Sequence, residues 1–272
     1  MTHPPKPPIA STPKAKEIRL ILTPPSMSVI AVYNLKGGVG KTSAAVNLAY
    51  LSAQDGHNTL LWDLDPQGAA TFYCRVKPKV KGGAQKIVRS KRNLDPAIRG
   101  TDFDNLDLLP ADFSYRTFDS TLDATKKPVR HLATLIKPLK KEYDHLIFDC
   151  ADGLATLSES VFFAADLLLI PVIPTTLSLL TYEQVKKHLK KKTKKPPRML
   201  PFFSMVDRRK RLHKEICATY ANGKDGFLTA TVPFASTVER MGAERAPLPS
   251  YDHRSRATLA YKALWDEVKA MM

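Results

Sequence analysis

The stretch Lys36-Gly37-Gly38-Val39-Gly40-Lys41-Thr42 decides the fold, because it stands between a short β-branched segment and a helix-compatible one. A glycine-rich turn in that position lets consecutive backbone N–H groups point at an anion, and the N-terminus of the helix adds partial positive charge. Lys41 would then reach the β- and γ-phosphates of a nucleotide, and the Thr42 hydroxyl would bind Mg²⁺. The stretch therefore predicts a nucleotide site made by Gly37, Gly38, Val39, Gly40, Lys41, Thr42 and Ser43.

Short apolar runs alternate with longer amphipathic stretches on both sides of this loop. The alternation is typical of βαβ units, so we expect an α/β fold with a mainly parallel, twisted sheet and helices on both faces. The expected strands are Val29–Tyr33, Thr59–Asp63, Leu106–Leu109, His145–Asp149, Leu167–Ile173, Met199–Met205 and Thr229–Val232. The expected helices are Ser43–Gln54, Val129–Lys140, Leu157–Ala165, Leu179–Lys191, Arg208–Tyr220 and Arg256–Met271.

Carboxylates stand where two of the expected strands end. Asp63 and Asp65 follow the second strand, and alternation places them on the same side of the chain. Asp149 ends the strand His145–Asp149. The carboxyl ends of strands border the ligand crevice in open α/β sheets, so Asp63 and Asp65 are expected to face the nucleotide. Many buried strands end in Asp for turn chemistry, so Asp149 carries a signal only together with the other motifs. A lone Asp-x-Asp would more often be a solvated turn, but its position after the phosphate loop favours a functional role.

The loop departs from the common GxxxxGK[ST] pattern, because Leu35 stands where the first glycine is required and Lys36 opens the loop. With that leading lysine the sequence resembles the deviant Walker A motif of the ParA/Soj/MinD family of ATPases, and it is most similar to the small Soj-like partition ATPases. The resemblance covers residues 28–270. It implies that Lys36 reaches across an ATP-sandwich dimer to the partner's phosphates. It also implies that Asp65 positions or activates the attacking water, while Asp63 organises the Mg²⁺ shell and Asp149 holds Mg²⁺.

Two segments differ from the pattern of that family. Cys150-Ala151-Asp152-Gly153 stands where members commonly carry a proline-containing switch II, so the role of Asp152 is open. Ser204 stands where relatives often place an asparagine near the adenine. Pro233 and the backbone near it are therefore the expected adenine contacts.

Positive charge dominates the composition. The 272 residues carry 42 Lys plus Arg against 26 Asp plus Glu, a formal net charge of +16. Basic blocks without a base-reading motif favour sequence-independent contact with a phosphate backbone, although a single run is more often a solvated face. Soj-like relatives bind DNA nonspecifically as ATP dimers. The candidate DNA contacts are Lys186, Lys190, Arg208, Arg209 and Arg240.

The domain organisation is simple. Residues 1–27 hold seven of the 21 prolines and predict a flexible arm, and residues 28–272 predict a single domain. The longest apolar run, Leu167–Ile173, has seven residues, far fewer than the roughly 20 that span a bilayer. Three widely spaced cysteines indicate buried free thiols rather than disulfides or a zinc site. We therefore expect a cytoplasmic, nucleoid-associated protein without a stable membrane anchor.

These observations, with the resemblance, predict a Mg²⁺-dependent ATPase. It would form a homodimer on ATP binding, bind nonspecific DNA in that state, and be released when a ParB-like or other adaptor stimulates hydrolysis, so that a cargo is segregated or positioned. The main alternative is a MinD-like ATPase recruited to an anionic membrane, with Ala257–Met272 as the candidate membrane helix. A P-loop kinase or metabolic enzyme would need a substrate pocket and lid. An iron–sulfur reductase is disfavoured by the spacing of the cysteines.

Overall fold

The computed structural model describes residues 27–90, 93–193 and 195–272, so the predicted arm lies outside the described residues except for its last one. Met27, the first described residue, is buried in the core. In this part of the chain one sheet of eight strands runs in the order β3-β4-β2-β5-β1-β6-β7-β8. The strands are β1 (Ser28–Val32), β2 (Thr59–Asp63), β3 (Arg99–Gly100), β4 (Leu106–Leu109), β5 (His145–Asp149), β6 (Leu167–Val172), β7 (Arg198–Val206) and β8 (Thr231–Pro233).

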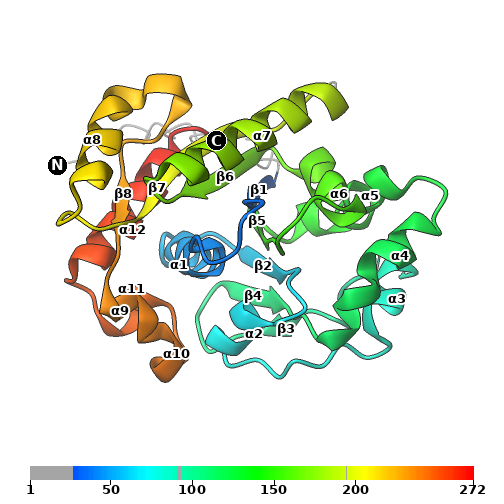
Figure 1. Ribbon diagram of the computed structural model, residues 1–272. Helices are drawn as coiled ribbons and strands as arrows, with labels where there is room; N and C mark the ends of the chain where they lie inside the picture. Colours follow the sequence, from blue (N-terminus) through cyan, green and yellow to red (C-terminus); the bar gives the residue numbers. More distant parts are fainter. Residues whose placement is uncertain (1–26, 91–92, 194) are drawn as a thin grey trace, which may run out of the picture.

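All neighbouring strands pair in parallel except β3 and β4, whose two-residue pairing is antiparallel. The central strands read as continuous apolar runs because helices cover both faces of the sheet (Figure 1). In β2 and β5 every residue is buried. The predicted fold class is confirmed, and seven of the eight strands were expected; β3 is too short to leave a pattern in the sequence.

Helices on one face of the sheet share a core with α1, which follows the phosphate loop. They are α1 (Lys41–Gln54), α2 (Ala69–Tyr73), α10 (Met241–Glu244), α11 (Leu248–Tyr251) and α12 (Arg256–Lys269). The opposite face is covered by α3 (Gly83–Val88), α4 (Phe118–Asp123), α5 (His131–Leu135), α6 (Thr156–Ala164), α7 (Thr176–Lys192) and α8 (Arg211–Thr219). The remaining short helices are η1 (Phe113–Thr117), η2 (Pro128–Arg130), η3 (Pro138–Lys141), η4 (Ala221–Gly226) and α9 (Ser236–Glu239).

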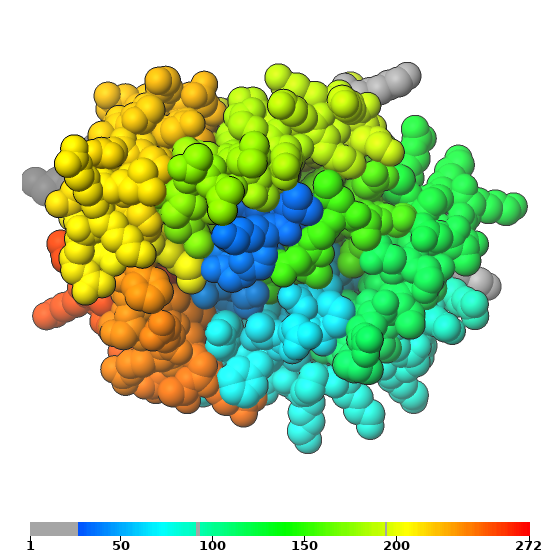
Figure 2. Space-filling view, in the orientation of Figure 1, coloured from blue at the N-terminus to red at the C-terminus, as the bar shows by residue number. Residues whose placement is uncertain are grey.

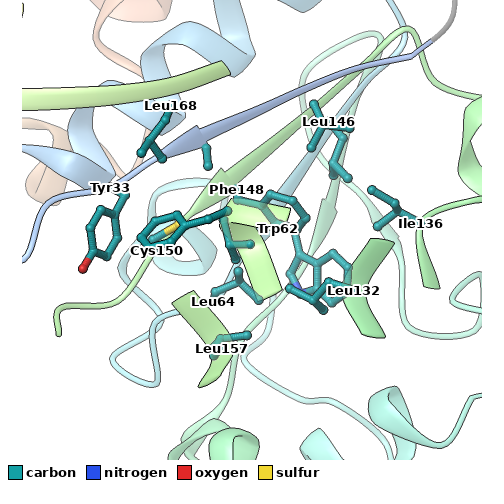
Figure 3. Packing of buried hydrophobic residues seen from close by; sticks show 14 of the residues in the cluster. Tyr33, Trp62, Leu64, Leu132, Ile136, Leu146, Phe148, Cys150, Leu157 and Leu168 are labelled. Carbon is teal, nitrogen blue, oxygen red and sulfur yellow. The ribbon is translucent and has the colours of Figure 1, made fainter. Parts of the chain in front are cut away.

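Alternate residues of each central strand enter the two cores. In β1, Val29 and Ala31 face the α3–α8 side, whereas Ile30 and Val32 face the α1 side. Figure 3 shows part of the first core, where Trp62 of β2 lies beside Phe148 of β5 with ring centroids 5.5 Å apart. This packing fixes the strand ends from which the functional side chains project.

One expected helix is broken. The segment 129–140 forms η2, α5 and η3 rather than one helix, because Pro138 cannot donate a helical hydrogen bond and the residue before a proline avoids the helical region. The short helices between residues 69 and 123 and between residues 236 and 251 were not predicted, since four to six residues are too few to show a helical period.

The cysteines and the hydropathy agree with the sequence in most respects. All three cysteines are free; Cys74 and Cys150 are buried as predicted, whereas Cys217 is only half-buried. Within residues 27–90, 93–193 and 195–272 no helix is both long and apolar enough to cross a membrane.

Candidate nucleotide-binding site

The phosphate loop, residues 36–42, leaves the carboxyl end of β1 and turns into α1. Gly38 and Gly40 have φ angles of 68° and 90°, a left-handed conformation that glycine adopts without strain. At Gly40 a side chain would also meet Ser204, because a Cβ atom there would lie 2.9 Å from its Oγ. The loop therefore needs glycine both for its turn and for its contact with β7.

The loop is shaped to receive an anion. Among the described residues, no protein acceptor takes a hydrogen bond from the amides of Gly37 to Gly40. Helix α1 begins after Gly40 without any side-chain cap, which leaves the positive end of a 14-residue helix open at the loop. In Figure 2 the N-terminal part of the domain, coloured blue, reaches the surface in the middle of the view.

The two lysines of the loop differ in environment. Lys41 is 7% exposed, and its ammonium donates to the Lys36 carbonyl oxygen at 3.3 Å and contacts the Asp152 carboxylate. Lys36 is exposed at the mouth of the loop. We predicted that Lys41 acts within the site and that Lys36 reaches outward. This remains a prediction, and the burial of Lys41 and the exposure of Lys36 are compatible with it.

The Asp149 carboxylate differs from those of Asp63 and Asp65 in its hydrogen bonding. It ends the central strand β5, is fully buried, and neither carboxylate oxygen has a hydrogen-bond partner within the described residues. Burial raises its pKa well above the usual range and the charge of Asp63 raises it further, while the nearby Thr42 hydroxyl and Lys41 ammonium act in the opposite direction. A buried carboxylate without partners costs free energy unless a cation satisfies it. Asp149 and Thr42 thus fit Mg²⁺.

The composition of the site suits Mg²⁺ rather than a metal caged by protein. In the described part of the chain no three His, Cys, Asp or Glu side chains could hold a metal ion together. Mg²⁺ usually keeps several waters and binds through one or two carboxylates plus substrate phosphates. Bound there, it would neutralise charge between the phosphates and Asp149.

Asp63 is engaged by its own strand end. It is the register partner of Asp149 on the neighbouring strand β2. Its Oδ2 accepts hydrogen bonds from the Thr71 amide at 2.8 Å and the Thr71 hydroxyl at 2.7 Å, and its Oδ1 accepts from the Asp65 amide at 3.1 Å. Burial raises its pKa to about 6. The metal role predicted for Asp63 remains a prediction, and the geometry gives this residue a second task, which is to hold the turn that carries Asp65.

Asp65 lies in that turn, partly exposed, at the same edge of the sheet as the phosphate loop. Its Oδ1 accepts from the Gln67 amide at 2.9 Å, whereas Oδ2 accepts no hydrogen bond from the described residues. A carboxylate that is fixed through one oxygen can use the other to orient a water molecule. Its predicted catalytic role is compatible with this position.

Sequence reasoning missed two residues that shape the site. Asn34 holds the entrance of the loop, since its Nδ2 donates to the Pro171 carbonyl at 2.8 Å and its Oδ1 accepts from the Lys36 amide at 2.9 Å. Thr71 holds Asp63 as described above. Asn34 could have been noticed because a polar residue directly follows a strand that is otherwise apolar, whereas Thr71 has no signal in the sequence.

The predicted adenine contact lies apart from the loop. Pro233 ends β8, and the sheet order places β6 and β7 between β8 and β1. Ser204 of β7, which stands at the position expected near the adenine, packs behind Gly40 instead. Pro233 therefore stays a prediction, with the exposed Phe234 beside it.

The five predicted DNA contacts do not form one compact cluster. Arg208 and Arg209 follow β7 and Arg240 follows β8, so these three lie toward the carboxyl edge. Lys186 and Lys190 lie in the second half of α7, which runs back toward the amino ends of the strands. Ion pairs within the described residues engage three of the five: Lys186 with Glu183, Arg209 with Asp207 and Arg240 with Glu244.

Comparisons with known proteins decide the family. A family model described as an AAA domain matches residues 27–200. The sporulation initiation inhibitor protein Soj of Bacillus subtilis is 30% identical over 251 residues, which cover 89% of this chain and 98% of that protein. The chain belongs to the ParA/Soj/MinD family of P-loop ATPases. The predicted resemblance and the predicted class of enzyme, an ATPase, are thereby confirmed.

Other members and solved structures agree with this assignment. The chromosome partitioning protein ParA of Myxococcus xanthus is 29% identical over 248 residues, covering 88% of this ParA-family chain and 87% of that protein. The ATP complex of a variant of McdA from Cyanothece superposes with a TM-score of 0.77 at 19% identity, over 90% of this chain and 96% of that one. MinD of Pyrococcus horikoshii, complexed with Mg-ADP, gives a TM-score of 0.73 at 23% identity, over 90% and 97%. At these identities the structures establish the shared fold.

Proposed function

We propose that this ParA-family ATPase dimerises around two Mg·ATP and binds nonspecific DNA in that state. An adaptor protein of the ParB type would stimulate hydrolysis and release it, so that a cargo is segregated or positioned in the cytoplasm along the nucleoid. The observation that carries the proposal is the exposed Lys36 at the mouth of the phosphate loop, on a face that also presents apolar side chains.

Exposed leucines support the proposal that this face contacts another protein. Leu177 and Leu180 are 68% and 56% exposed in the first turns of α7, which begins at the carboxyl end of β6. Leu154 follows β5 and Phe234 follows β8, and both are also exposed at this edge. Single exposed apolar residues are ordinary, but several at the edge that holds the ligand site favour a protein contact there. A second copy facing this edge would bring its own Lys36 toward the nucleotide.

The membrane alternative has less support. In α12 the side chains of Tyr261, Leu264, Trp265 and Val268 are buried in the core. A helix that inserts into a membrane surface must present its apolar face to lipid. If α12 were inserted into a membrane, its apolar face would have to leave the core that it stabilises.

The test of dimerisation is light scattering on a sizing column with ATP, with ADP and without nucleotide. We expect a dimer with ATP only, and we expect Lys36→Ala to stay monomeric while it still binds ATP. Lys262→Ala, which removes an exposed lysine of α12, is the matched control. A monomer at saturating ATP in the unchanged protein would contradict the proposal.

The test of DNA binding is retention on DNA over a salt series. Phosphate contacts release counterions, so retention of the ATP-bound form should fall steeply between low and moderate salt. Lys190→Glu and Arg208→Glu should weaken retention on DNA further. Lys262→Glu, which makes the same change of charge on α12, is the matched control. Sedimentation with anionic liposomes instead of retention on DNA would support the membrane alternative.

A further inference from the structure

A carboxylate of the chain itself pairs with the lysine that should bind the phosphates. Asp152 lies three residues after Asp149, and its Oδ1 contacts the Lys41 ammonium. Lys41 is nearly buried at 7% exposure, whereas Asp152 is 55% exposed. This ion pair joins the segment after β5 to the phosphate loop.

The position of Asp152 in the loop is fixed from two sides. Its carboxylate lies against Gly37, where an added Cβ atom would come within 2.5 Å of Oδ2. The next residue is anchored, because the Gly153 carbonyl accepts a hydrogen bond from the Tyr33 hydroxyl at 2.9 Å. The Tyr33 ring in turn packs edge-on against Phe162 of α6, with centroids 4.8 Å apart. The carboxylate is thus held over the cradle by a loop packed on the core.

An anion in that place competes with the anion that the loop is built to bind. The Lys41 ammonium can pair fully with a phosphate only if the Asp152 carboxylate moves away from it. If the carboxylate stays, two anions lie beside one ammonium and repel each other. We propose that Asp152 acts as an internal counter-ion of Lys41, which closes the phosphate loop without nucleotide and must be displaced when ATP binds. The inference rests on the proposed nucleotide site and adds a residue that sets its affinity.

Displacement would also move the segment that carries Asp152. Residues 150–155 connect β5 directly to α6, and α6 begins at Thr156. Because Gly153 has a φ of 91°, the segment contains a left-handed turn at which it can change direction. Occupancy of the phosphate loop is therefore coupled to the position of this connection.

The test compares Asp152→Asn and Asp152→Ala with the unchanged protein by calorimetric titration of Mg·ATP and by thermal unfolding without nucleotide. Removing the competing charge should tighten ATP binding about two- to fivefold, the range expected for a partly exposed ion pair. The nucleotide-free protein should lose about 2 to 4 °C of unfolding midpoint because Lys41 loses its partner. Asp266→Asn, which neutralises an exposed carboxylate on α12, should change neither quantity.

The opposite signs of the two effects separate this role from a structural one. A residue that merely shaped the site would weaken ATP binding when replaced, and that result, or an unchanged affinity in both variants, would overturn the proposal. Failure of the unchanged protein to bind ATP would instead overturn the proposed function. Because Asp152 is more than half exposed, the variants should fold, and circular dichroism checks this.

Discussion

The two ends of strand β5 contain buried polar residues of opposite character. At the amino end, His145 Nδ1 lies 2.7 Å from the Ser52 hydroxyl, and that hydroxyl lies 2.7 Å from the Thr59 hydroxyl. The His145 ring also packs against Trp265, whose indole N–H donates to Asp55. At the carboxyl end, Asp149 is buried and neither of its carboxylate oxygens has a partner in the described part of the chain.

The presence or absence of hydrogen-bond partners separates buried polar groups that stabilise the fold from those that are available to bind a ligand. A buried polar group with partners contributes roughly 1 kcal/mol per hydrogen bond, whereas one without partners costs about 1–3 kcal/mol. A free energy cost of that kind persists where function requires it. Variants at the carboxyl end should therefore change ligand binding with little loss of stability, and variants at the amino end should do the reverse.

The largest effect is expected for Lys41→Ala. Removing the ammonium that would bind the phosphates should weaken ATP binding by about 100-fold or more, since an interaction between a buried charge and a ligand charge is worth about 3 kcal/mol. Without nucleotide the unfolding midpoint should fall by no more than about 2 to 4 °C, as for Asp152→Asn, because both variants break the same Lys41–Asp152 ion pair. Titration calorimetry measures the affinity, and tight ATP binding by the variant would remove Lys41 from the site.

At the amino end, His145→Ala should lower the free energy of unfolding by about 2–3 kcal/mol, because it leaves the Ser52 hydroxyl with one partner fewer and a cavity beside Trp265. Denaturant unfolding measures the change. ATP affinity of the folded variant should equal that of the unchanged protein, and a weaker affinity would break the separation between the two ends.

The amino end should also respond to acid. Burial lowers the pKa of His145 to about 4, from an ordinary value of 6.5. Between these values the unfolded chain binds more protons than the folded one, so the contribution of His145 is complete above about pH 6.5 and is lost as the pH falls toward 4. The loss should reach about 2–3 kcal/mol. Unfolding curves across this range, compared with His145→Gln, isolate the histidine; identical pH dependence in the two proteins would contradict its assignment.

The smallest effect, and the most direct test of the difference between the two ends of β5, is expected for Asp149→Asn. A neutral amide in place of an unpaired buried carboxylate should raise the free energy of unfolding by about 1 kcal/mol at pH 8 without nucleotide. The same variant should lose the stimulation of ATP hydrolysis by Mg²⁺. Destabilisation with hydrolysis intact would place Asp149 among the structural residues, beside His145.

Much of this arrangement could be read from short-range patterns. The strand–glycine loop–helix order predicted the phosphate loop, and apolar runs predicted β2 and β5 with their terminal acids. Parallel strands present their carboxyl ends at one edge, so the meeting of Asp63 and Asp149 followed from the topology. The helix pieces between residues 69 and 123 did not follow, because their lengths are set by packing on the sheet rather than by a period in the sequence.

The sequence alone determined the ATPase family, the sheet and the edge where the ligand site lies, because these depend on residue types at fixed local spacing. The tertiary structure decided which polar groups have partners: it joined Thr71 to Asp63, packed Ser204 behind Gly40 and left the Asp149 carboxylate without a hydrogen bond from any described residue. It also brought Asp152 onto Lys41 across 111 residues of chain. Such contacts depend on the distance and burial of side chains from separate elements, and no local pattern specifies either.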